Sequence, residues 1–566
     1  MSEGAPIPLT EARALLDAGA VGRAIAALRD LVAHSPGLAE AHTLLAQALE
    51  ASGDRPGSER ALRQALAVQP DCIIAAVRLA TLITPRRRAL EAVAILGPLA
   101  DHPEADTALY TALGMALKTA SRHDEAVEAY RRAADTSPAS AEAQHNLAGA
   151  LGDGHRFAES LAGTDRVFAM GLDAPETWLV RGRSLYGLGQ YDAAEAAFRE
   201  AIGRRGDYAD AHAELAQLLW MRTEDAAVAV EEIDRALRLA PANAPLALAK
   251  SKVLEYAGDP EGAYGALAEP LANRRNDLAL QISAAQLMLS VDAELALAHA
   301  ERAFAMAPYS GPAASTLCQA NLALGRADVA ARLAEDLMRD WPLDQHPVAL
   351  AATAWRILGD PRYRPLHDYS RLVFRQTLET PPGWPTLAVY LNDLAISLRR
   401  LHQMRGHPVG QSLRHGAQTS EALTRSTDPA IKAFFTAIEA PIDAYIDRLR
   451  GHDDVLGRRV ASGYRFAGAW SALLRPGGHH VDHIHPLGWI SSAFHVELPA
   501  AVEDGRQGWL KFGEPGVVTS PVLGPEHFVK PRAGDLVLFP SYMWHGTVPF
   551  GGDAPRLAIA FDALPA

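Results

Sequence analysis

The order of apolar and polar positions divides this chain of 566 residues into two parts with different periodicities. From residue 8 to about 355, alanine and leucine recur at the spacing of amphipathic helices. From about 458 onwards, short runs rich in Val, Ile and aromatic residues are separated by Gly, Pro and Asp turns, which is typical of strands. The pattern predicts a multidomain protein: an all-helical region, a helical and looped connector over residues 356–457, and a small antiparallel β domain over residues 458–566.

Turn residues interrupt the helical region at a nearly constant interval. They are spaced 32 to 37 residues apart, at Pro36, Pro70, Pro103, Pro138, Pro175, Asp207, Pro241, Asn276, Pro308 and Pro342. A period this regular predicts a solenoid of about ten helix pairs over residues 8–355, each pair burying its apolar face against its neighbours. Such solenoids present a long concave surface that commonly binds peptides or proteins. A role as a spacer or self-association scaffold is the alternative, so a homo-oligomer stays open.

One repeat indicates what each position does. In "ETWLVRGRSLYGLGQYDAAEAAFREAI", bulky, small and turn-forming residues fall where two antiparallel helices need bulk, close approach and a reversal of direction. These residues are Trp178, Gly182, Leu185, Gly189, Tyr191, Ala194, Phe198 and Ala201. The same frame recurs 68 residues earlier, beginning at Tyr110. The spacing resembles the tetratricopeptide repeat, and the resemblance implies an all-α solenoid with a surface for peptides or proteins.

The connector contains a polar loop and a helix start. "RGHPVGQSLRHGAQTS" (405–420) is predicted to be an extended loop, and a helix is predicted to start with Asp428 as its N-cap and Pro429 in its first turn. Either the loop lines the mouth of a site in the β domain or it is a packed connector. Its polar residues are Gln411, Ser412, Arg414 and His415.

The stretch "GGHHVDHIHP" holds four histidines and one aspartate. Imidazole is a common metal ligand, and two ligands at positions i and i+2 of a strand point to the same face. One candidate pair is His480 with Asp482. The other is His483 with His485, and because the two pairs have opposite parity, they are not expected to face one metal together. His545, just after an apolar strand, is the candidate third ligand.

A basic residue follows on the next predicted strand, "RLAIAF". There Arg556, Ala558 and Ala560 share one face, so the arginine points beside small residues that leave room. A guanidinium in such a pocket is suited to binding a carboxylate.

Two segments, "GGHHVDHIHPLGWISSAFHVELP" and "GDLVLFPSYMWHGTVPFGGDAPRLAIAFD", resemble the double-stranded β-helix of Fe(II)/2-oxoglutarate-dependent oxygenases, a jelly-roll or cupin-like fold. The arrangement is similar to bacterial oxygenases that carry this domain after tetratricopeptide repeats, and to aspartyl/asparaginyl β-hydroxylases. The resemblance implies Fe(II) and 2-oxoglutarate as cofactors with O₂ as co-substrate. It also allows ascorbate as an accessory reductant.

The resemblance assigns roles to individual residues. The implied metal ligands are His483, His485 and His545, with His480 and Asp482 as the alternative proximal pair. The implied 2-oxoglutarate contacts are Arg556, His495 and Thr547. Aromatic residues that could line the substrate mouth are Trp489, Tyr542 and Trp544, although aromatic residues at strand ends are commonly core. Three neutral imidazoles leave the metal one negative charge short of the usual two-histidine, one-carboxylate set.

The combined features favour a dioxygenase that hydroxylates a peptide or protein side chain delivered by the repeat array. One alternative is an oxygenase of a small metabolite, with the repeats serving only for assembly. Another is a non-catalytic repeat adaptor with a vestigial barrel. A structural zinc site is a further alternative for the histidine cluster, although such sites more often include cysteine and no cysteine is near.

Composition excludes other classes of partner. The formal net charge is −13 and no long Lys/Arg run occurs, which argues against a nucleic-acid partner. No apolar run approaches the roughly 20 residues needed to span a bilayer, and the first residues lack the pattern of a signal peptide. Cys72 and Cys318 lie far apart, which argues against a disulfide framework. We therefore expect a cytoplasmic protein with neither a membrane nor a nucleic-acid partner.

Overall fold

The structure is a computed structural model that describes residues 8–86, 88–419 and 423–566. The chain separates into two compact units, Met1–Arg204 and Arg205–Ala566. This division falls inside the predicted array, so repeat helices contribute to both units. The predicted boundaries near residues 355 and 458 stay predictions, and the first seven residues of the chain lie outside the described part.

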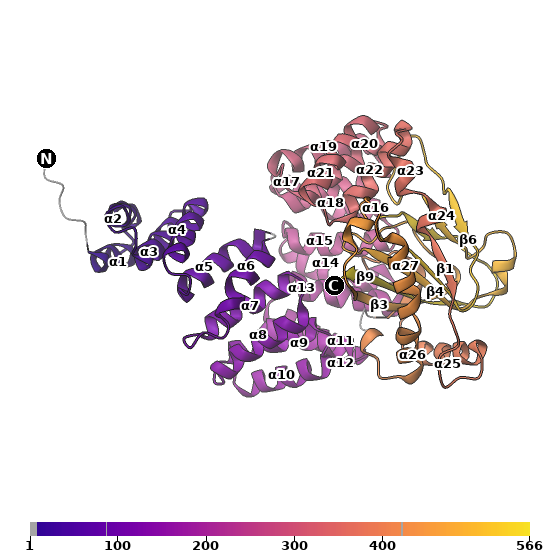
Figure 1. Ribbon diagram of the computed structural model, residues 1–566, viewed down its shortest axis with the longest axis horizontal. Helices are drawn as coiled ribbons and strands as arrows, with labels where there is room; N and C mark the ends of the chain where they lie inside the picture. The colour runs from indigo at the N-terminus through magenta and orange to yellow at the C-terminus, as the bar shows by residue number, and fades with distance from the viewer. Residues whose placement is uncertain (1–7, 87, 420–422) are drawn as a thin grey trace. The chain divides into compact units, whose positions relative to one another are not determined.

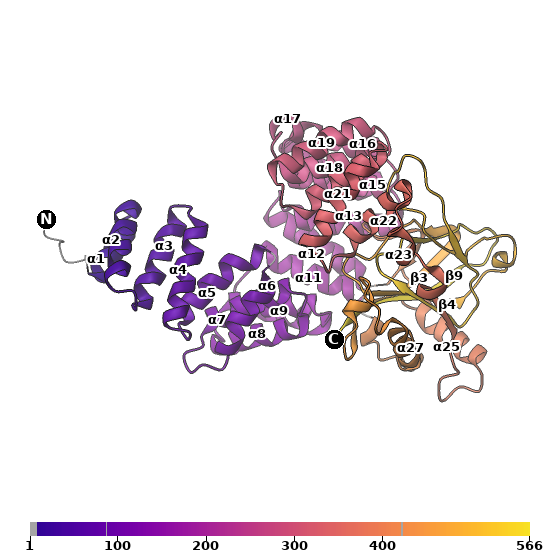
Figure 2. The same ribbon diagram turned by 45° about the horizontal axis from the view of Figure 1, so that its top comes forward.

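The first unit consists of consecutive antiparallel helix pairs (Figures 1 and 2). Asp54, Asp106 and Ser140 cap helices by accepting hydrogen bonds from main-chain N–H groups of the first turn. The predicted solenoid is thereby confirmed. The bounds are α1 Leu9–Asp17, α2 Val21–His34, α3 Ala39–Ala51, α4 Arg55–Val68, α5 Ile73–Ile83, η1 Thr84–Arg86, α6 Ala89–Leu96, η2 Gly97–Leu99, α7 Thr107–Thr119, α8 His123–Thr136, α9 Ala141–Asp153, α10 Phe157–Ala169, α11 Pro175–Gly187 and α12 Tyr191–Arg204.

Glycine allows the two helices of a pair to approach closely. A Cβ atom at Gly114 of α7 would lie 2.7 Å from the ring of Tyr130 on α8. A Cβ atom at Gly182 of α11 would likewise overlap the ring of Phe198 on α12. Both rings are buried, so the small residue and the aromatic residue of the repeat frame serve one contact.

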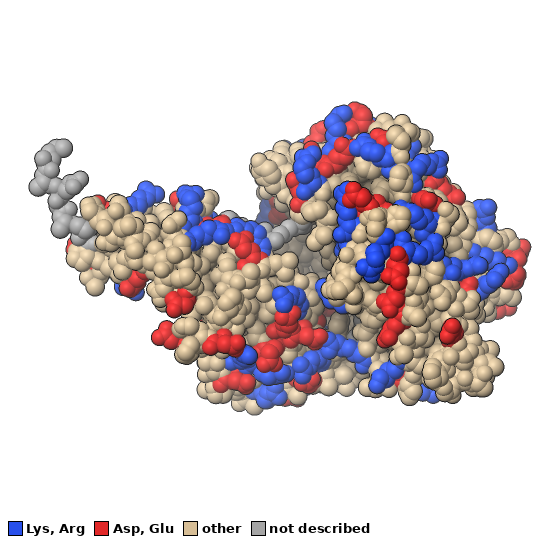
Figure 3. All heavy atoms as spheres, viewed as in Figure 1, with Lys and Arg blue, Asp and Glu red and all other residues tan. Residues whose placement is uncertain are grey.

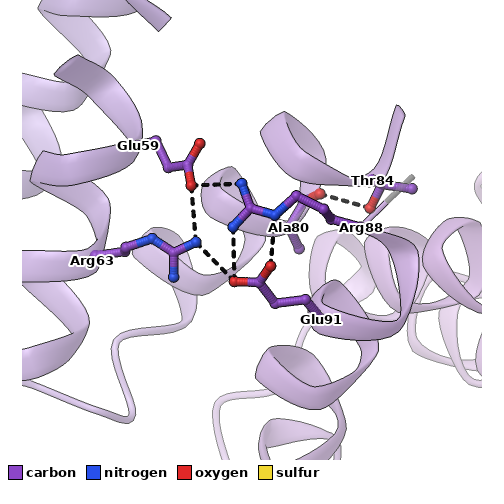
Figure 4. A network of polar contacts seen from close by, with 6 residues as sticks. All are labelled: Glu59, Arg63, Ala80, Thr84, Arg88 and Glu91. Atoms are coloured by element: carbon purple, nitrogen blue, oxygen red, sulfur yellow. Dashed lines mark hydrogen bonds and ion pairs between the residues drawn. The ribbon is translucent and has the colours of Figure 1, made fainter. Parts of the chain in front are cut away.

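Charged side chains link successive helix pairs of the first unit. Figure 4 shows Glu59 and Arg63 of α4 close to Arg88 and Glu91 at the start of α6. Arg63 lies 2.9 Å from Glu59 and 2.8 Å from Glu91, and Arg88 lies 2.7 Å from each of the same two carboxylates. Hydrogen bonds from Arg88 and Arg63 lower the pKa of Glu91 to about 2. Each charge in this network therefore has an opposite partner.

The second unit contains further helix pairs, then the connector and the β domain. The first helices of successive pairs touch one another, α13 with α15 and α18 with α20, so they line the inner side of the stack. The bounds are α13 Ala209–Thr223, α14 Ala226–Leu239, α15 Ala244–Tyr256, α16 Pro260–Ala266, α17 Ala268–Asn273, α18 Leu278–Met288, α19 Ala293–Met306, α20 Gly311–Ala323, α21 Ala327–Asp340, α22 Gln345–Leu358, α23 Tyr363–Leu366, α24 Tyr369–Leu372, α25 Leu387–Arg399, η3 Leu423–Arg425, α26 Pro429–Ala437, α27 Glu439–Leu449, η4 Gly457–Arg459 and η5 Ala500–Glu503.

The strands form two antiparallel sheets. One has six strands in the order β1-β7-β4-β9-β3-β2, and the other has three in the order β6-β5-β8. An isolated antiparallel bridge between His483 and His545 joins the β3–β4 segment to β8. The predicted jelly-roll type of β domain is confirmed. The bounds are β1 Phe374–Thr377, β2 Leu413–Gln418, β3 Tyr464–His480, β4 Ile490–Glu497, β5 Leu510–Phe512, β6 His527–Val529, β7 Asp535–Pro540, β8 His545–Thr547 and β9 Arg556–Pro565.

The connector agrees with the sequence at one point and differs at another. The side chain of Asp428 accepts hydrogen bonds from the N–H groups of Ala430 and Ile431, which confirms the predicted N-cap of α26. The loop predicted over 405–420 is corrected, because its residues Leu413–Gln418 pair with β3 as an edge strand. An edge strand needs little apolar alternation, so the polar sequence concealed it. Residue 420 lies outside the described residues.

Strand β9 separates the core from the interior of the β domain. Its odd-numbered side chains from Leu557 to Ala563 are buried, and Phe561 lies with Phe494 of β4 against Phe434 of α26, at ring centroid distances of 6.4 and 4.8 Å from Phe434. Helices α25 to α27 cover this face of the six-stranded sheet (Figure 1). The even-numbered side chains point to the opposite face, and Ala558 and Ala560 stay partly accessible there. The small residues therefore line an interior that solvent reaches.

Charge is mixed over the surface. On the face shown in Figure 3, basic and acidic side chains lie next to one another rather than in separate fields. Many are ion pairs within a helix, such as Arg122 with Glu125. Within residues 8–86, 88–419 and 423–566, no helix is both long enough and apolar enough to cross a bilayer.

Candidate metal centre

Main-chain hydrogen bonds bring three histidines together between the two sheets. The N–H of His483 donates to the carbonyl of His545 at 2.9 Å, and the reverse bond is 3.0 Å long. His485, two residues along, donates its N–H to the carbonyl of Ser541 at 3.0 Å. One ring nitrogen from each of the three histidines lies within 4.8 Å of the others. His545 is buried, whereas His483 and His485 stay partly exposed, so the cluster is accessible from one side.

Each imidazole is held through its Nδ1 atom. Nδ1 of His483 is 2.9 Å from the carbonyl of Val481, and Nδ1 of His545 is 2.9 Å from the carbonyl of Met543. Nδ1 of His485 is 2.6 Å from Oδ2 of Asp562. Carbonyl and carboxylate oxygens accept, so Nδ1 carries the hydrogen and Nε2 carries the lone pair. A histidine that ligates a metal through Nε2 is fixed in this way.

Two of the Nε2 atoms face each other, and the hydroxyl of Ser412 lies 3.2 Å from one of them, that of His483. Nε2 of His483 and Nε2 of His485 are 3.2 Å apart. Two lone pairs at this distance repel unless a proton or a cation lies between them. Burial, and then the neighbouring His485, lower the pKa of His483 to about 3, which disfavours the proton. The cluster therefore fits a metal cation.

Asp562 is the functional residue that sequence reasoning missed. It lies on β9, where its carboxylate accepts from Nδ1 of His485 and, at 2.7 Å, from the hydroxyl of Ser491. Ser491 in turn is 2.8 Å from Oγ of Ser541. The signal was available, because Asp562 shares the parity of Arg556 along the same strand. The carboxylate of Asp562 thus brings one negative charge into hydrogen-bond contact with a histidine of the cluster.

The alternative proximal pair is arranged differently. Asp482 pairs with Lys511 at 2.7 Å, and Lys511 also pairs with Glu514. Burial raises the pKa of Asp482 to about 6 in spite of the opposing effect of Lys511. His480 lies beside the cluster, with its ring centroid 5.9 Å from that of His483, but it is not among the three converging histidines.

The prediction that the two proximal pairs do not face one metal together agrees with the cluster, which contains neither His480 nor Asp482, although the strand alternation behind it ends early. Strand β3 stops at His480, and the next strand starts at Ile490. The residues between them do not alternate as a strand does, so the rings of His480 and His483 can stack although 480 and 483 differ in parity. Ser412 contacts both rings, at 3.0 Å from Nδ1 of His480 and 3.2 Å from Nε2 of His483.

The interior also holds a buried cation without an anion. Arg556 is 3% exposed, and its contact is with Nδ1 of His495 at 3.3 Å. Its Nε atom and Nε2 of His495 are buried without a partner. Within the described part of the chain, no carboxylate lies at ion-pair distance from Arg556. Burial lowers the pKa of this guanidinium to about 10, although it stays cationic at neutral pH.

Register relates Arg556 to the other interior groups. Residue 556 pairs with Leu474 of β3, and His495 pairs with Ala558 of β9, which puts Arg556 and His495 on the same sheet face. The hydroxyl of Thr547 accepts from the N–H of His480 at 2.8 Å and keeps its own hydrogen to donate, so its contact with 2-oxoglutarate stays a prediction. An unpaired, buried guanidinium on an accessible face fits an anionic ligand from outside the chain.

The three aromatic residues expected at the substrate mouth are core residues. Trp489, Tyr542 and Trp544 are 0%, 1% and 5% exposed. Their polar atoms donate to the carbonyls of Leu456 and Leu366 and to the hydroxyl of Thr353, at 3.0, 3.1 and 3.0 Å. Apolar rings with satisfied donors pack at strand ends, which corrects the expectation. Leu487, two residues after His485 in the sequence, is 76% exposed.

Known families match both the helical region and the β domain of the chain. Residues 468–562 match a family described as "Putative 2OG-Fe(II) oxygenase", and this segment includes the three histidines, Arg556 and Asp562. Residues 15–83, 107–140 and 179–244 match tetratricopeptide repeat families. The chain therefore carries tetratricopeptide repeats followed by a domain matched by a 2OG-Fe(II) oxygenase family. No curated protein matched the sequence.

Solved structures with some likeness include repeat proteins. A tetratricopeptide repeat protein from Parabacteroides merdae is 15% identical, with 44% of this chain and 98% of that chain covered and a TM-score of 0.36. Yeast Tom70 is 14% identical, with 64% and 96% covered and a TM-score of 0.33. PilF of Pseudomonas aeruginosa is 16% identical, with 36% and 92% covered and a TM-score of 0.31.

Proposed function

We propose that this chain is an Fe(II)- and 2-oxoglutarate-dependent dioxygenase that hydroxylates a side chain of a peptide or protein. The observation that carries the proposal is the set of three imidazoles with their Nδ1 atoms hydrogen-bonded and their Nε2 atoms convergent, close to a buried arginine without a counter-ion. The family match over residues 468–562 gives the reaction class. An ascorbate requirement has no support and is not proposed.

His483, His485 and His545 would hold the metal through Nε2. Nitrogen ligands suit iron, zinc, copper and nickel alike, so the choice of iron rests on the family match. Bound there, Fe(II) would supply the activation of O₂ that converts a C–H bond, 2-oxoglutarate and O₂ into an alcohol, succinate and CO₂. Asp562 would hold the ring of His485 in place and offset part of the charge that a three-histidine set lacks.

Arg556 would bind the carboxylate of 2-oxoglutarate that is remote from the metal. Its guanidinium has unused donors and is pre-positioned by the contact with His495. Ala558 and Ala560 leave space along the same strand face for the carbon chain of the ligand. Trp470 packs its ring on that of His485, at a centroid distance of 5.8 Å, and so excludes water from one side of the cluster.

The peptide or protein substrate is proposed from the domain combination. Repeat solenoids hold extended polypeptides, and this chain carries its repeats on the N-terminal side of the β domain. His483 and His485 stay partly exposed, and the exposed Leu487 follows two residues after His485, so an apolar residue of the substrate could pack on it. A substrate delivered there would lie within reach of the metal ligands.

Succinate formation tests the proposal. The full chain, loaded with Fe(II) under anaerobic conditions and then given 2-oxoglutarate and O₂, should release succinate, and a peptide digest should stimulate the release. His545→Ala should lower it at least about a hundredfold, because the metal loses one of three ligands. His479→Ala is the matched control, since His479 lies in the same stretch outside the cluster. Absence of succinate, or loss in the control alone, would refute the oxygenase. Stimulation by metabolites but not by peptides would refute the peptide substrate.

A further inference from the structure

Residues 405–412, between α25 and β2, contact the repeat helices at one end and the candidate metal centre at the other. We call this segment the strap. It belongs to the stretch that the sequence left open between a site-lining loop and a packed connector. Its contacts give it both roles.

At its first end the strap is held by the inner side of the repeat stack. The N–H groups of Arg405 and Gly406 donate to the carbonyl of Met221 on α13, at 2.9 and 2.8 Å. The indole N–H of Trp220 donates to the carbonyl of His407 at 3.0 Å. The ring of His407 stands edge-on to that of Trp220 at 5.5 Å, and its Nε2 is 3.2 Å from the carbonyl of Tyr256 at the end of α15.

The strap therefore occupies a surface that repeat arrays generally offer to other polypeptides. Helices α13 and α15 are first helices of their pairs and touch one another, so they belong to the inner side. Gly406 and His407 are buried there. At this part of the array, the chain's own residues take the position of a bound peptide.

At its other end the strap fixes the chain around His483. The carbonyl of Ser412 accepts from the N–H of Val481 at 3.0 Å, and the carbonyl of Val481 accepts from Nδ1 of His483 at 2.9 Å. The hydroxyl of Ser412 lies against the rings of His480 and His483. A displacement of the strap would therefore move the main chain and the side chain of a candidate metal ligand together.

We propose that helices α13 and α15 position the metal centre through the strap, with Trp220 and Ser412 as positioning residues. The inference rests on the proposed metal site. It assigns these repeats a role inside the oxygenase, distinct from substrate delivery. Trp220 acts by fixing the strap, and Ser412 acts through its carbonyl, which holds Val481 and thereby Nδ1 of His483.

Titration of the full chain with Co(II) alone, followed by its visible absorption, tests the proposal without turnover. Trp220→Phe, which removes only the donor and part of the ring system, should weaken Co(II) binding a few-fold and shift the absorption, because the strap holds Val481 and, through it, Nδ1 of His483. Ser412→Ala keeps the carbonyl that makes this contact and removes only a hydroxyl 3.2 Å from Nε2 of His483, so it should not weaken Co(II) binding.

Matched controls separate positioning from general damage. Trp178→Phe removes an indole donor from another first helix, α11, which belongs to the first unit and where the donor is bonded to Asp173 at 2.6 Å. Its Co(II) affinity should equal that of the wild type.

A second perturbation keeps the proposal testable if Trp220→Phe does not fold. A Cβ atom at Gly406 would lie 3.0 Å from the carbonyl oxygen of Trp220 and 3.2 Å from Cα of Met221, so Gly406→Ala should lift the strap off α13 and weaken Co(II) binding. Gly265→Ala on α16, where a Cβ atom meets open space, is its control. Wild-type affinity and spectrum in the folded Trp220→Phe and Gly406→Ala variants would overturn the positioning role. Failure of the wild type to bind Co(II) would instead overturn the proposed metal site.

Discussion

The charged network of the first unit and the interior of the β domain differ in how their polar side chains are paired. In the network of Figure 4, two arginines alternate with two glutamates, and each guanidinium contacts both carboxylates. In the β domain, Arg556 is buried with no carboxylate of the described residues at ion-pair distance, and two imidazole Nε2 atoms face each other at 3.2 Å. The first region is paired within the chain, whereas the second has the arrangement expected of a site for a metal and an anion.

The difference separates structural charge from functional charge. Paired side chains on a solvated helix surface contribute modestly to stability and need nothing else. Unpaired polar groups in an interior cost stability, and a fold that keeps them gains by binding a ligand. The following changes test this distinction, beginning with the largest expected effect.

Replacing Arg556 should separate stability from function. Arg556→Met keeps the volume and removes the buried charge, so 2-oxoglutarate affinity should fall roughly a hundredfold or more. The free energy of unfolding should rise by about 1 kcal/mol, because an unpaired interior cation is replaced by an apolar side chain. Calorimetric titration with 2-oxoglutarate and urea unfolding measure the two effects.

Arg63→Met is the matched control for that change, because Arg63 belongs to the paired network. It should lower the free energy of unfolding by about 0.5 kcal/mol and leave 2-oxoglutarate binding unchanged. If Arg556→Met were as destabilising as the loss of a buried, paired arginine, the cation would have a partner inside the fold, and the contrast between the two regions would fail.

Removing the charge next to His485 should weaken the metal site without deleting a ligand. In Asp562→Asn the side chain keeps its size but loses the carboxylate that accepts from Nδ1 of His485. Metal affinity should drop about 10- to 100-fold, measured by competition with a chelator. Asp535→Asn serves as control, since Asp535 is a buried aspartate that bonds to Thr377. Equal metal affinity in Asp562→Asn and the wild type would remove Asp562 from the centre.

The smallest effect is expected in the paired network. Glu91 has a pKa of about 2, below its usual 4.5, so its ion pairs stabilise the fold above pH 4.5 and lose this contribution as the pH falls through 2. Because 36% of its side chain is exposed, screening reduces the contribution to about 0.5–1 kcal/mol. Glu91→Gln should show this loss in urea unfolding at pH 7, and the difference from wild type should shrink in acid. A constant difference from pH 7 to pH 2 would contradict the assignment.

Most of the fold could be predicted from sequence patterns with a fixed period. The regular spacing of turn residues from Pro36 to Pro342 predicted the helix pairs, and the two-residue period of the later segments predicted the strands of the β domain. Asp428 predicted the start of its helix because an N-cap depends only on residues close in sequence. The strand over Leu413–Gln418 was not predicted, because its pairing with β3 is a long-range event at a sheet edge.

The candidate site was predictable where a strand imposes alternation. The alternation of side chains along β9 predicts that Arg556, Ala558 and Ala560 share one face. The same alternation puts Asp562, two residues beyond Ala560, on that face. Parity failed around His480 and His483, because β3 ends there and the following residues are not a strand. Trp489 and Tyr542 were placed at the substrate mouth because they are aromatic residues at strand ends. Their burial depends on segments distant in sequence, whose residues Leu456 and Leu366 accept their hydrogen bonds.

The bridge between His483 and His545 has a consequence for the supply of metal in the cell. His545 lies on β8 of the three-stranded sheet and His483 on the segment that joins β3 to β4 of the six-stranded sheet, so a shared ion would act as a reversible cross-link between these parts. Occupancy would then raise the unfolding temperature of the β domain in proportion to the logarithm of free metal. A cell short of the metal would hold less folded protein as well as less active protein, because the uncross-linked form is more exposed to proteolysis.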